Sequence, residues 1–179
     1  MSFEAICAYL DAAGIRYVLI GGVAVAARGA GRSTLDIDML TTDSAVLKDE
    51  FWAAISDRGF RVDVRKGDWD DPLAGVVRID AGEAIDVVVG KYKWESAVIE
   101  RAETMTVRGI ELRVPKTADL ILLKLSAGGP RDNTDAGRLL RVGDREAIVC
   151  HLEDVKPTLP DDLQRRLADF LAQNSSSIG

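Results

Sequence analysis

Three aspartates stand at strand-like positions, where a charged side chain needs a partner. Asp36 and Asp38 alternate with apolar residues over 35–40, so a period of two places both carboxylates on one face of a strand. Asp86 interrupts the apolar run 84–89, which has the composition of a buried strand. Clustered buried carboxylates repel one another unless a divalent cation, an Arg or a Lys neutralises them. A solvated strand edge is the alternative for Asp36 and Asp38.

The residue types in this pattern favour magnesium over other metals. Magnesium prefers hard oxygen ligands and keeps coordination sites for water and substrate phosphates. Three carboxylates suit such an ion better than a site built on the single histidine, His151. We therefore predict Mg²⁺ at Asp36, Asp38 and Asp86.

A glycine pair precedes these aspartates, between a predicted strand and a predicted helix. Gly21 and Gly22 would let backbone N–H groups approach a phosphate, although an ordinary tight turn would also use two glycines. Arg32 and Ser33 follow, and their guanidinium and hydroxyl groups are suited to phosphate or sugar oxygens. The alternative for Arg32 and Ser33 is a polar loop without a ligand.

The elements that must position these residues form a β-containing front and a helical rear. Strands are expected at 17–20, 35–40, 60–64, 75–80, 84–89, 105–108 and 110–114, and 75–80 pairs with 84–89 as a hairpin. Front helices are expected at 3–13, 23–28, 45–58 and 93–102, and rear helices at 118–127, 134–140, 145–152 and 161–172. We predict a core over 1–114, a helical C-terminal part over 115–173 and a flexible tail over 174–179.

Composition bounds the class of protein. The 179 residues are 47% hydrophobic, which suits one compact domain, and the net charge of -6 disfavours a uniformly basic, nucleic-acid-coating surface. Arg131, Arg138, Arg141 and Arg145 are candidates for a local tRNA-binding patch, or else belong to a solvated face of mixed charge. The two cysteines lack metal-ligand or disulfide patterning, and the N-terminal segment lacks a secretory layout. We expect a cytoplasmic protein without membrane contact.

The order of these motifs resembles the nucleotidyltransferase superfamily related to DNA polymerase beta. The segment LIGGVAVAARGAGRSTLDIDML is most similar to the small bacterial nucleotidyltransferases of the AbiEii/AbiGii toxin type. The resemblance covers roughly residues 15–135. It implies a nucleotidyltransferase fold of the α/β (α+β) class, with a mixed sheet flanked by helices and a helical C-terminal part. The chain departs from many members by having Gly21-Gly22 where they have Gly-Ser.

The resemblance also implies roles for individual residues. Asp36 and Asp38 would hold metal and triphosphate, and Asp86 would share one of two Mg²⁺ ions and help to activate the attacking hydroxyl. Gly21 and Gly22 would line the phosphates. Lys124 would contact the triphosphate, its alternative being a snorkelling surface lysine. The segment Arg131-Asp132-Asn133-Thr134-Asp135 resembles a family segment, but Asp132 or Asp135 could also cap the next helix, which needs no function.

Three functions follow as hypotheses. The first is Mg²⁺-dependent transfer of a nucleoside monophosphate from an NTP such as ATP to tRNA or a protein, in a toxin–antitoxin setting with a cognate antitoxin. The second is modification of a small hydroxyl compound such as an antibiotic, which the net charge of -6 mildly favours. The third is a non-catalytic nucleotide-binding or antitoxin-binding module. Retention of all three carboxylates favours catalysis.

Overall fold

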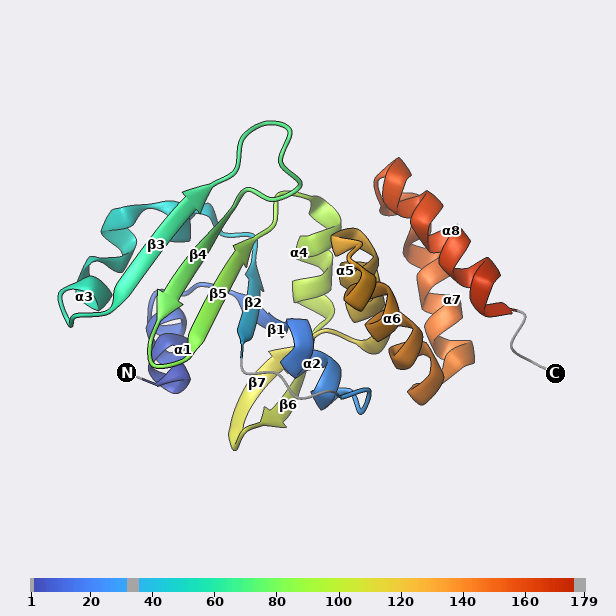
Figure 1. Ribbon diagram of the computed structural model, residues 1–179, viewed down its shortest axis with the longest axis horizontal. Helices are drawn as coiled ribbons and strands as arrows, with labels where there is room; N and C mark the ends of the chain where they lie inside the picture. Colours follow the sequence, from blue (N-terminus) through green and yellow to red (C-terminus); the bar gives the residue numbers. More distant parts are fainter. Residues whose placement is uncertain (1, 32–35, 176–179) are drawn as a thin grey trace.

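A five-stranded mixed sheet forms the centre of the computed structural model, which describes residues 2–31 and 36–175 (Figure 1). Its strands are β1 (Tyr17–Ile20), β2 (Ile37–Thr41), β3 (Arg61–Lys66), β4 (Gly75–Asp80) and β5 (Ala84–Val89). Their order is β1-β2-β5-β4-β3, in which β2 and β5 are parallel and the other neighbours antiparallel. The mixed sheet confirms the predicted fold class, and β4 and β5 form the predicted hairpin.

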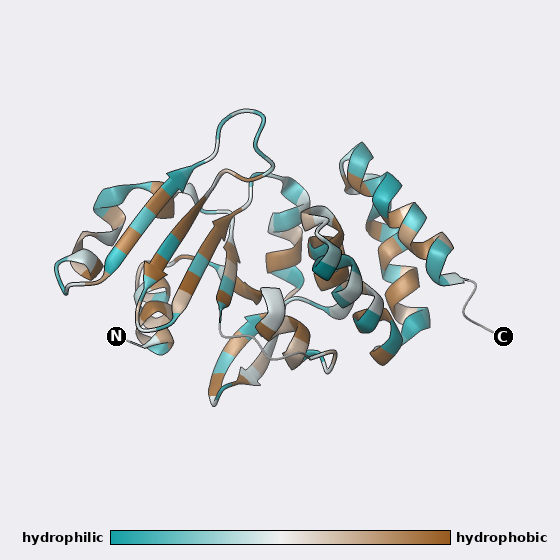
Figure 2. Ribbon diagram, viewed as in Figure 1, coloured by the Kyte–Doolittle hydropathy of each residue, from teal (hydrophilic) through white to brown (hydrophobic). Residues whose placement is uncertain are grey.

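One face of the sheet is buried in the main hydrophobic core. Alternate residues of β2, β4 and β5, among them Met39, Val77 and Val87, are buried in one cluster with residues of α1 (Phe3–Ala12). Figure 2 shows the corresponding alternation of hydrophobic and hydrophilic residues along β3 and β4. This alternation places the intervening side chains on the opposite face.

The opposite face is covered over β1 and β2. A second cluster joins Val18 and Leu40 to Ile99 of α4 (Lys93–Arg101), and Leu123 of α5 (Thr117–Ala127) packs against it. Farther along this face, the inward-outward alternation places Asp86 on β5 and Arg78 on β4. The part of this face over β3, β4 and β5 therefore carries polar side chains.

Outside the sheet and its covering helices lie α2, a hairpin and the rear helices. They are α2 (Gly21–Ala27), β6 (Glu103–Val107), β7 (Ile110–Val114), α6 (Pro130–Val142), α7 (Arg145–Val155) and α8 (Asp161–Ser175). The last four helices of the chain, α5 to α8, lie together on one side of the sheet (Figure 1). None of the helices in the described ranges is long and apolar enough to cross a bilayer.

The predicted helix over 45–58 is wrong. The segment instead forms two 3-10 turns, Ser44–Leu47 and Asp49–Trp52, followed by the short helix α3 (Ala53–Ser56). Lys48 between the turns is extended, and the Trp52 indole N–H donates to the Val46 carbonyl oxygen at 2.7 Å. The buried indole thereby takes an acceptor that a continuous helix would use for its own backbone.

Candidate active site

Asp38 and Asp86 are side-by-side neighbours in the sheet. They are register partners on the parallel strands β2 and β5, and both side chains belong to the face that carries the polar residues. Ile20, the last residue of β1, pairs with Asp38 on its other side. The sheet thus brings together two aspartates that lie far apart in the sequence, together with the start of the glycine pair.

Gly21 lies directly against the Asp38 carboxylate. Its φ of +66° falls in the left-handed region, and a Cβ built on it would overlap Asp38 Oδ2. Only glycine meets both conditions without strain. Gly22 is the next residue of α2 and is buried. The glycine pair therefore lies beside the predicted metal ligands, as a phosphate-lining role requires.

Burial is the first cause that raises the pKa of Asp38, and the neighbouring charge of Asp86 is the second. Lys124 acts in the opposite direction, whereas Asp36 and Asp132 add to the increase. Desolvation and like charges both disfavour a carboxylate. Asp38 is therefore a largely desolvated carboxylate that lies against like charges, with Lys124 as the opposing cation.

Arg78 of β4 engages Asp86 through both carboxylate oxygens. Its Nε donates to Oδ1 at 2.8 Å and its Nη2 donates to Oδ2 at 2.6 Å. The two residues are cross-strand partners in the β4–β5 hairpin. Pairing with Asp86 raises the pKa of the Arg78 guanidinium. Arg78 is thus in direct contact with one of the paired aspartates.

The structure gives positions for two of the other predicted site residues, Asp36 and Lys124. Asp36 precedes β2 and is exposed, and its charge acts on both Asp38 and Arg78. Lys124 is buried, so it is not a snorkelling surface lysine; its Nζ lies 2.8 Å from Asp132 Oδ1 and 3.7 Å from Asp135 Oδ2. Arg32 and Ser33 lie outside the described residues.

The Asp132 carboxylate has two hydrogen-bond partners. Besides pairing with Lys124, its Oδ2 accepts from the Gly129 backbone N–H at 3.2 Å, at the start of α6. The helix-capping interpretation of this residue is confirmed. The same contact holds the Lys124 ammonium at the α5–α6 junction.

A family model described as a nucleotidyl transferase of unknown function (DUF2204) matches residues 2–160. The chain belongs to this family. It is therefore a nucleotidyltransferase, in agreement with the superfamily predicted from the glycine and aspartate motifs. No curated protein sequence matches the chain.

Solved nucleotidyltransferases share the fold at low sequence identity. The structure of ANT(2")-Ia in complex with adenylyl-2"-tobramycin aligns with a TM-score of 0.55 and 17% identity, over 96% of this chain and 95% of that one. An antigenic nucleotidyltransferase-like protein from Paracoccidioides brasiliensis gives 0.52 and 13%, over 96% and 86%. The lincomycin-bound lincosamide adenylyltransferase LnuA gives 0.50 and 13%, over 78% and 95%. These likenesses support the fold.

The donor set of this nucleotidyltransferase fits a magnesium ion that binds together with its nucleotide. No three His, Cys, Asp or Glu side chains among the described residues are gathered into a ready-made metal site. Magnesium, however, needs only one or two carboxylates when substrate phosphates and water complete its shell. Asp38 and Asp86 supply two. Burial first and the charge of Asp86 second raise the pKa of Asp38, and a bound cation would offset the repulsion between the two carboxylates.

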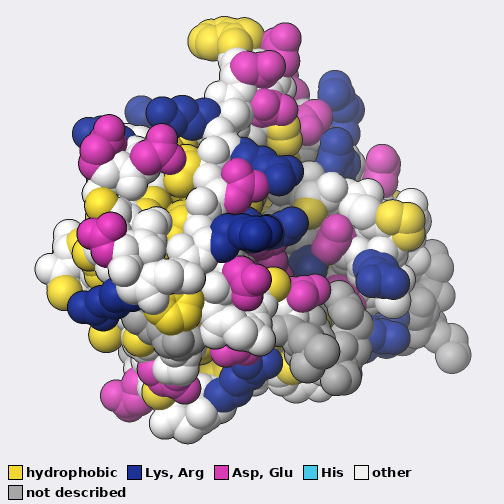
Figure 3. Space-filling view, turned by 60° about the vertical axis from the view of Figure 1, so that its left-hand side comes forward, with side chains coloured by type: hydrophobic (Ala, Val, Ile, Leu, Met, Phe, Trp, Pro, Cys, Tyr) yellow, Lys and Arg dark blue, Asp and Glu magenta, His cyan; other side chains and the backbone are white. Residues whose placement is uncertain are grey.

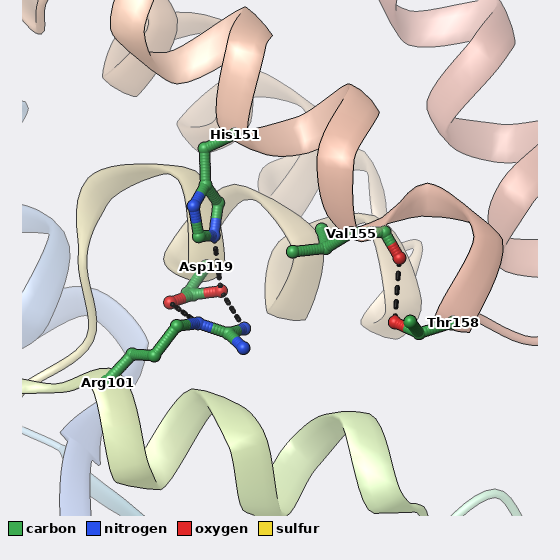
Figure 4. Close-up of polar contacts among 5 residues, drawn as sticks. All are labelled: Arg101, Asp119, His151, Val155 and Thr158. Carbon is green, nitrogen blue, oxygen red and sulfur yellow. Dashed lines mark hydrogen bonds and ion pairs between the residues drawn. The ribbon is translucent and has the colours of Figure 1, made fainter.

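A polar network around one buried carboxylate connects the core of the nucleotidyltransferase to its rear helices (Figure 4). The Asp119 side chain on α5 is fully buried and pairs with Arg101 of α4, the shortest contact being 2.7 Å from Nη2 to Oδ1. His151 Nε2 of α7 lies 3.2 Å from the same oxygen. His151 therefore has a packing partner and no place among the carboxylates of the site.

Sequence reasoning missed Arg78 and the Arg101–Asp119 pair. A signal for Arg78 existed, because the predicted strands 75–80 and 84–89 place Arg78 opposite Asp86 when the hairpin closes symmetrically. Arg101 and Asp119 lie on different helices, and no local spacing connects them.

Proposed function

We propose that this nucleotidyltransferase uses magnesium to transfer a nucleoside monophosphate from an NTP to a hydroxyl group. The observation that carries the proposal is the pairing of Asp38 with Asp86 beside Gly21. Asp36, Asp38 and Asp86 would hold the metal, two ions being the number expected from the resemblance. Bound magnesium would neutralise the triphosphate and the charge that develops in the transition state.

The chain's own residues supply positioning and proton transfer. Gly21, Gly22 and Lys124 would line the triphosphate, with Arg32 and Ser33 as further candidates from the sequence. The acceptor oxygen forms a bond to the α-phosphorus, and the bond from that phosphorus to the bridging oxygen of the β-phosphate breaks and releases pyrophosphate. The hydroxyl proton passes to Asp86, whose oxygens retain lone pairs beside the Arg78 contacts.

Of the acceptors predicted from the sequence, we propose a small hydroxyl compound. A cavity of about 440 Å³ lies beside Asp86, a size typical of small-molecule sites. Two of the arginines considered for tRNA are engaged within the helical part: Arg138 lies 3.8 Å from Asp135, and Arg145 donates to the Asn174 carbonyl oxygen at 2.6 Å. A tRNA or protein acceptor, the AbiEii-type assignment and an antitoxin partner stay predictions of the sequence resemblance.

Calorimetric titration of the four NTPs, with and without magnesium, tests the site. We expect magnesium-dependent binding in the wild type and its loss in the Asp36→Ala/Asp38→Ala variant. Asp63→Ala is the matched control, because Asp63 lies on the same face and pairs in register with Arg78 on β3–β4. Equal nucleotide binding by the double variant and the wild type would contradict the proposed site.

Asp38→Asn should abolish transfer without loss of fold. The pKa of Asp38 is raised above the ordinary value of 3.8, so the folded protein binds its proton more tightly than the unfolded chain does. Ionisation of Asp38 therefore opposes folding as the pH rises above 3.8 and through the raised pKa. At pH 7 without metal, the variant should unfold at a urea concentration equal to or above that of the wild type.

A further inference from the structure

A cavity of about 440 Å³ lies between the exposed part of the sheet and the loop 67–74 that joins β3 to β4. Its sheet side includes Val76, Val88, Arg78 and Asp86, and Arg65 and Lys66 line it at the end of β3. The loop stands above the ends of the strands (Figure 1). We call this cavity the acceptor pocket, a name that rests on the proposed function.

The strand register fixes the order of groups along the acceptor pocket. Arg65, Val76 and Val88 form one row across β3, β4 and β5, and Arg78 and Asp86 form the neighbouring row. Successive residues on one face of a strand are about 6.5 to 7 Å apart. A compact molecule that touches Val76 and Val88 therefore has Asp86 within reach at one end and Arg65 at the other.

The loop that walls the pocket is held by its own acidic side chains. Asp68 Oδ1 accepts from the backbone N–H groups of Asp70 and Asp71 at 3.0 and 3.2 Å, and Asp71 Oδ2 accepts from the Asp68 N–H at 2.8 Å. Lys91 Nζ donates to the Trp69 carbonyl oxygen at 3.1 Å and ties the loop to the segment after β5. Hydrogen bonds within the chain thus hold the loop that forms one wall of the pocket.

The pocket lining holds three cations and two carboxylates, an excess of one positive charge, although the whole chain carries -6. The cations are Arg65, Lys66 and Arg78. Of the two carboxylates, Asp86 pairs with Arg78, and Asp71 accepts a hydrogen bond from the loop backbone. Lys66 forms no ion pair with any residue in the described part of the chain. Figure 3 shows Lys and Arg side chains below the protruding loop, interspersed with Asp and Glu.

Arg65 retains donors for a ligand. Its Nε and Nη2 both contact Asp63 Oδ2, at 2.8 and 2.7 Å, and the side chain is 73% exposed. A guanidinium carries five N–H donors, so this pair leaves several of them unused. Arg65 and Lys66 together offer the charge-assisted hydrogen bonds that a phosphate or carboxylate group accepts.

We infer that the acceptor is a compact hydroxyl compound that carries a phosphate or carboxylate group. Its anionic group binds Arg65 and Lys66, its apolar body packs on Val76 and Val88, and its hydroxyl reaches Asp86. A cationic acceptor of the aminoglycoside class would place amino groups against Arg65 and Lys66, and these would repel it. The positive charges of Arg65 and Lys66 at the end of β3 therefore favour an anionic acceptor over a cationic one.

Three phenols of one shape and different charge test the inference. They are 4-hydroxyphenylacetate, which is anionic, tyrosol, which is neutral, and tyramine, which is cationic. Each is titrated into protein with assigned valine methyl groups, and the NMR shifts of Val76 and Val88 are followed. We expect saturable shifts with the anionic phenol and an at least tenfold weaker apparent affinity for the other two.

The variant Arg65→Gln/Lys66→Gln should weaken binding of the anionic phenol about tenfold or more. Arg61→Gln is the control, because Arg61 lies on the same face of β3 and outside the pocket lining, and it should leave the affinity unchanged. Equal shifts with all three phenols, stronger binding of tyramine, or no shift with any of them would overturn the inference. Calorimetry of NTP binding on the same samples separates these outcomes from failure of the proposed function, which predicts magnesium-dependent NTP binding whatever the acceptor.

Discussion

Arg78 and Asp86 face each other across the β4–β5 hairpin and form a two-point ion pair of 2.6 and 2.8 Å. The guanidinium neutralises one of the two aspartates that the parallel pairing of β2 and β5 brings together. A metal ion at Asp86 must therefore share or displace this partner. Strand β4, which forms part of the acceptor pocket, thus also supplies through Arg78 a positive charge at the proposed metal site.

Arg78→Met should raise the affinity of the nucleotide-free protein for Mg²⁺. The change removes a cation that repels the metal and occupies both oxygens of Asp86. Because the Arg78 side chain is 59% exposed, solvent screening limits the gain to about two- to fivefold. Calorimetric titration with Mg²⁺ measures it, with Arg61→Met as the control. Weaker binding of Mg²⁺ by Arg78→Met would show that Arg78 supports the metal site.

Gly21→Ala should abolish nucleotide binding, because the new methyl group overlaps the Asp38 carboxylate. Gly14→Ala provides the matched control: Gly14 has a similar φ of +71°, but a Cβ there would meet nothing within 4 Å. Both variants should lose about 1 to 2 kcal/mol of unfolding free energy through backbone strain. Only Gly21→Ala should lose NTP binding in calorimetry, and equal NTP binding by the two variants would contradict the close-approach argument.

Asp119→Ala should lower the free energy of unfolding by about 3 to 5 kcal/mol. The fully buried carboxylate pairs with Arg101 and contacts His151, so its removal leaves a guanidinium without its partner between α4 and α5. Urea denaturation measures the loss. Glu153→Ala is the control: this exposed carboxylate lies 3.6 Å from Lys156 on the helix surface, where ion pairs contribute little. A loss no larger than that of Glu153→Ala would show that the network does not join the core to the rear helices.

The two cysteines should differ in reactivity. Burial raises the pKa of the Cys7 thiol to about 11, whereas Cys150 is exposed. At pH 8 the thiolate fraction of Cys7 is about one in a thousand, so a thiol reagent such as DTNB should modify one thiol rapidly in the folded protein. The Cys7 thiol should react only after unfolding, or as the pH approaches its pKa of about 11. The control variant Cys150→Ser keeps only the Cys7 thiol. A fast reaction of this folded variant would contradict the burial of Cys7.

The sequence alone determined the elements that carry the site. The apolar run 84–89 predicted β5 with its bounds, and the glycine pair marked the end of β1. The helix after it was predicted at 23–28, whereas α2 begins two residues earlier, at Gly21 itself. These features depend on neighbouring residues, because side-chain direction alternates along a strand and because glycine relieves steric restrictions at its own position. The motifs also predicted the superfamily, which the family match over 2–160 confirms.

The tertiary structure decided which of these residues meet. The parallel pairing of β2 with β5 places Asp86 beside Asp38 rather than beside Asp36, and no local pattern specifies the register between strands so far apart in the sequence. The prediction of a helix over 45–58 was wrong for a related reason, because the buried Trp52 indole donates its N–H to the Val46 carbonyl oxygen within the packed core. Arg101 and Asp119 likewise become partners only when α4 and α5 pack together. Non-local burial and strand register, which a linear pattern does not encode, set the charge and shape of the site.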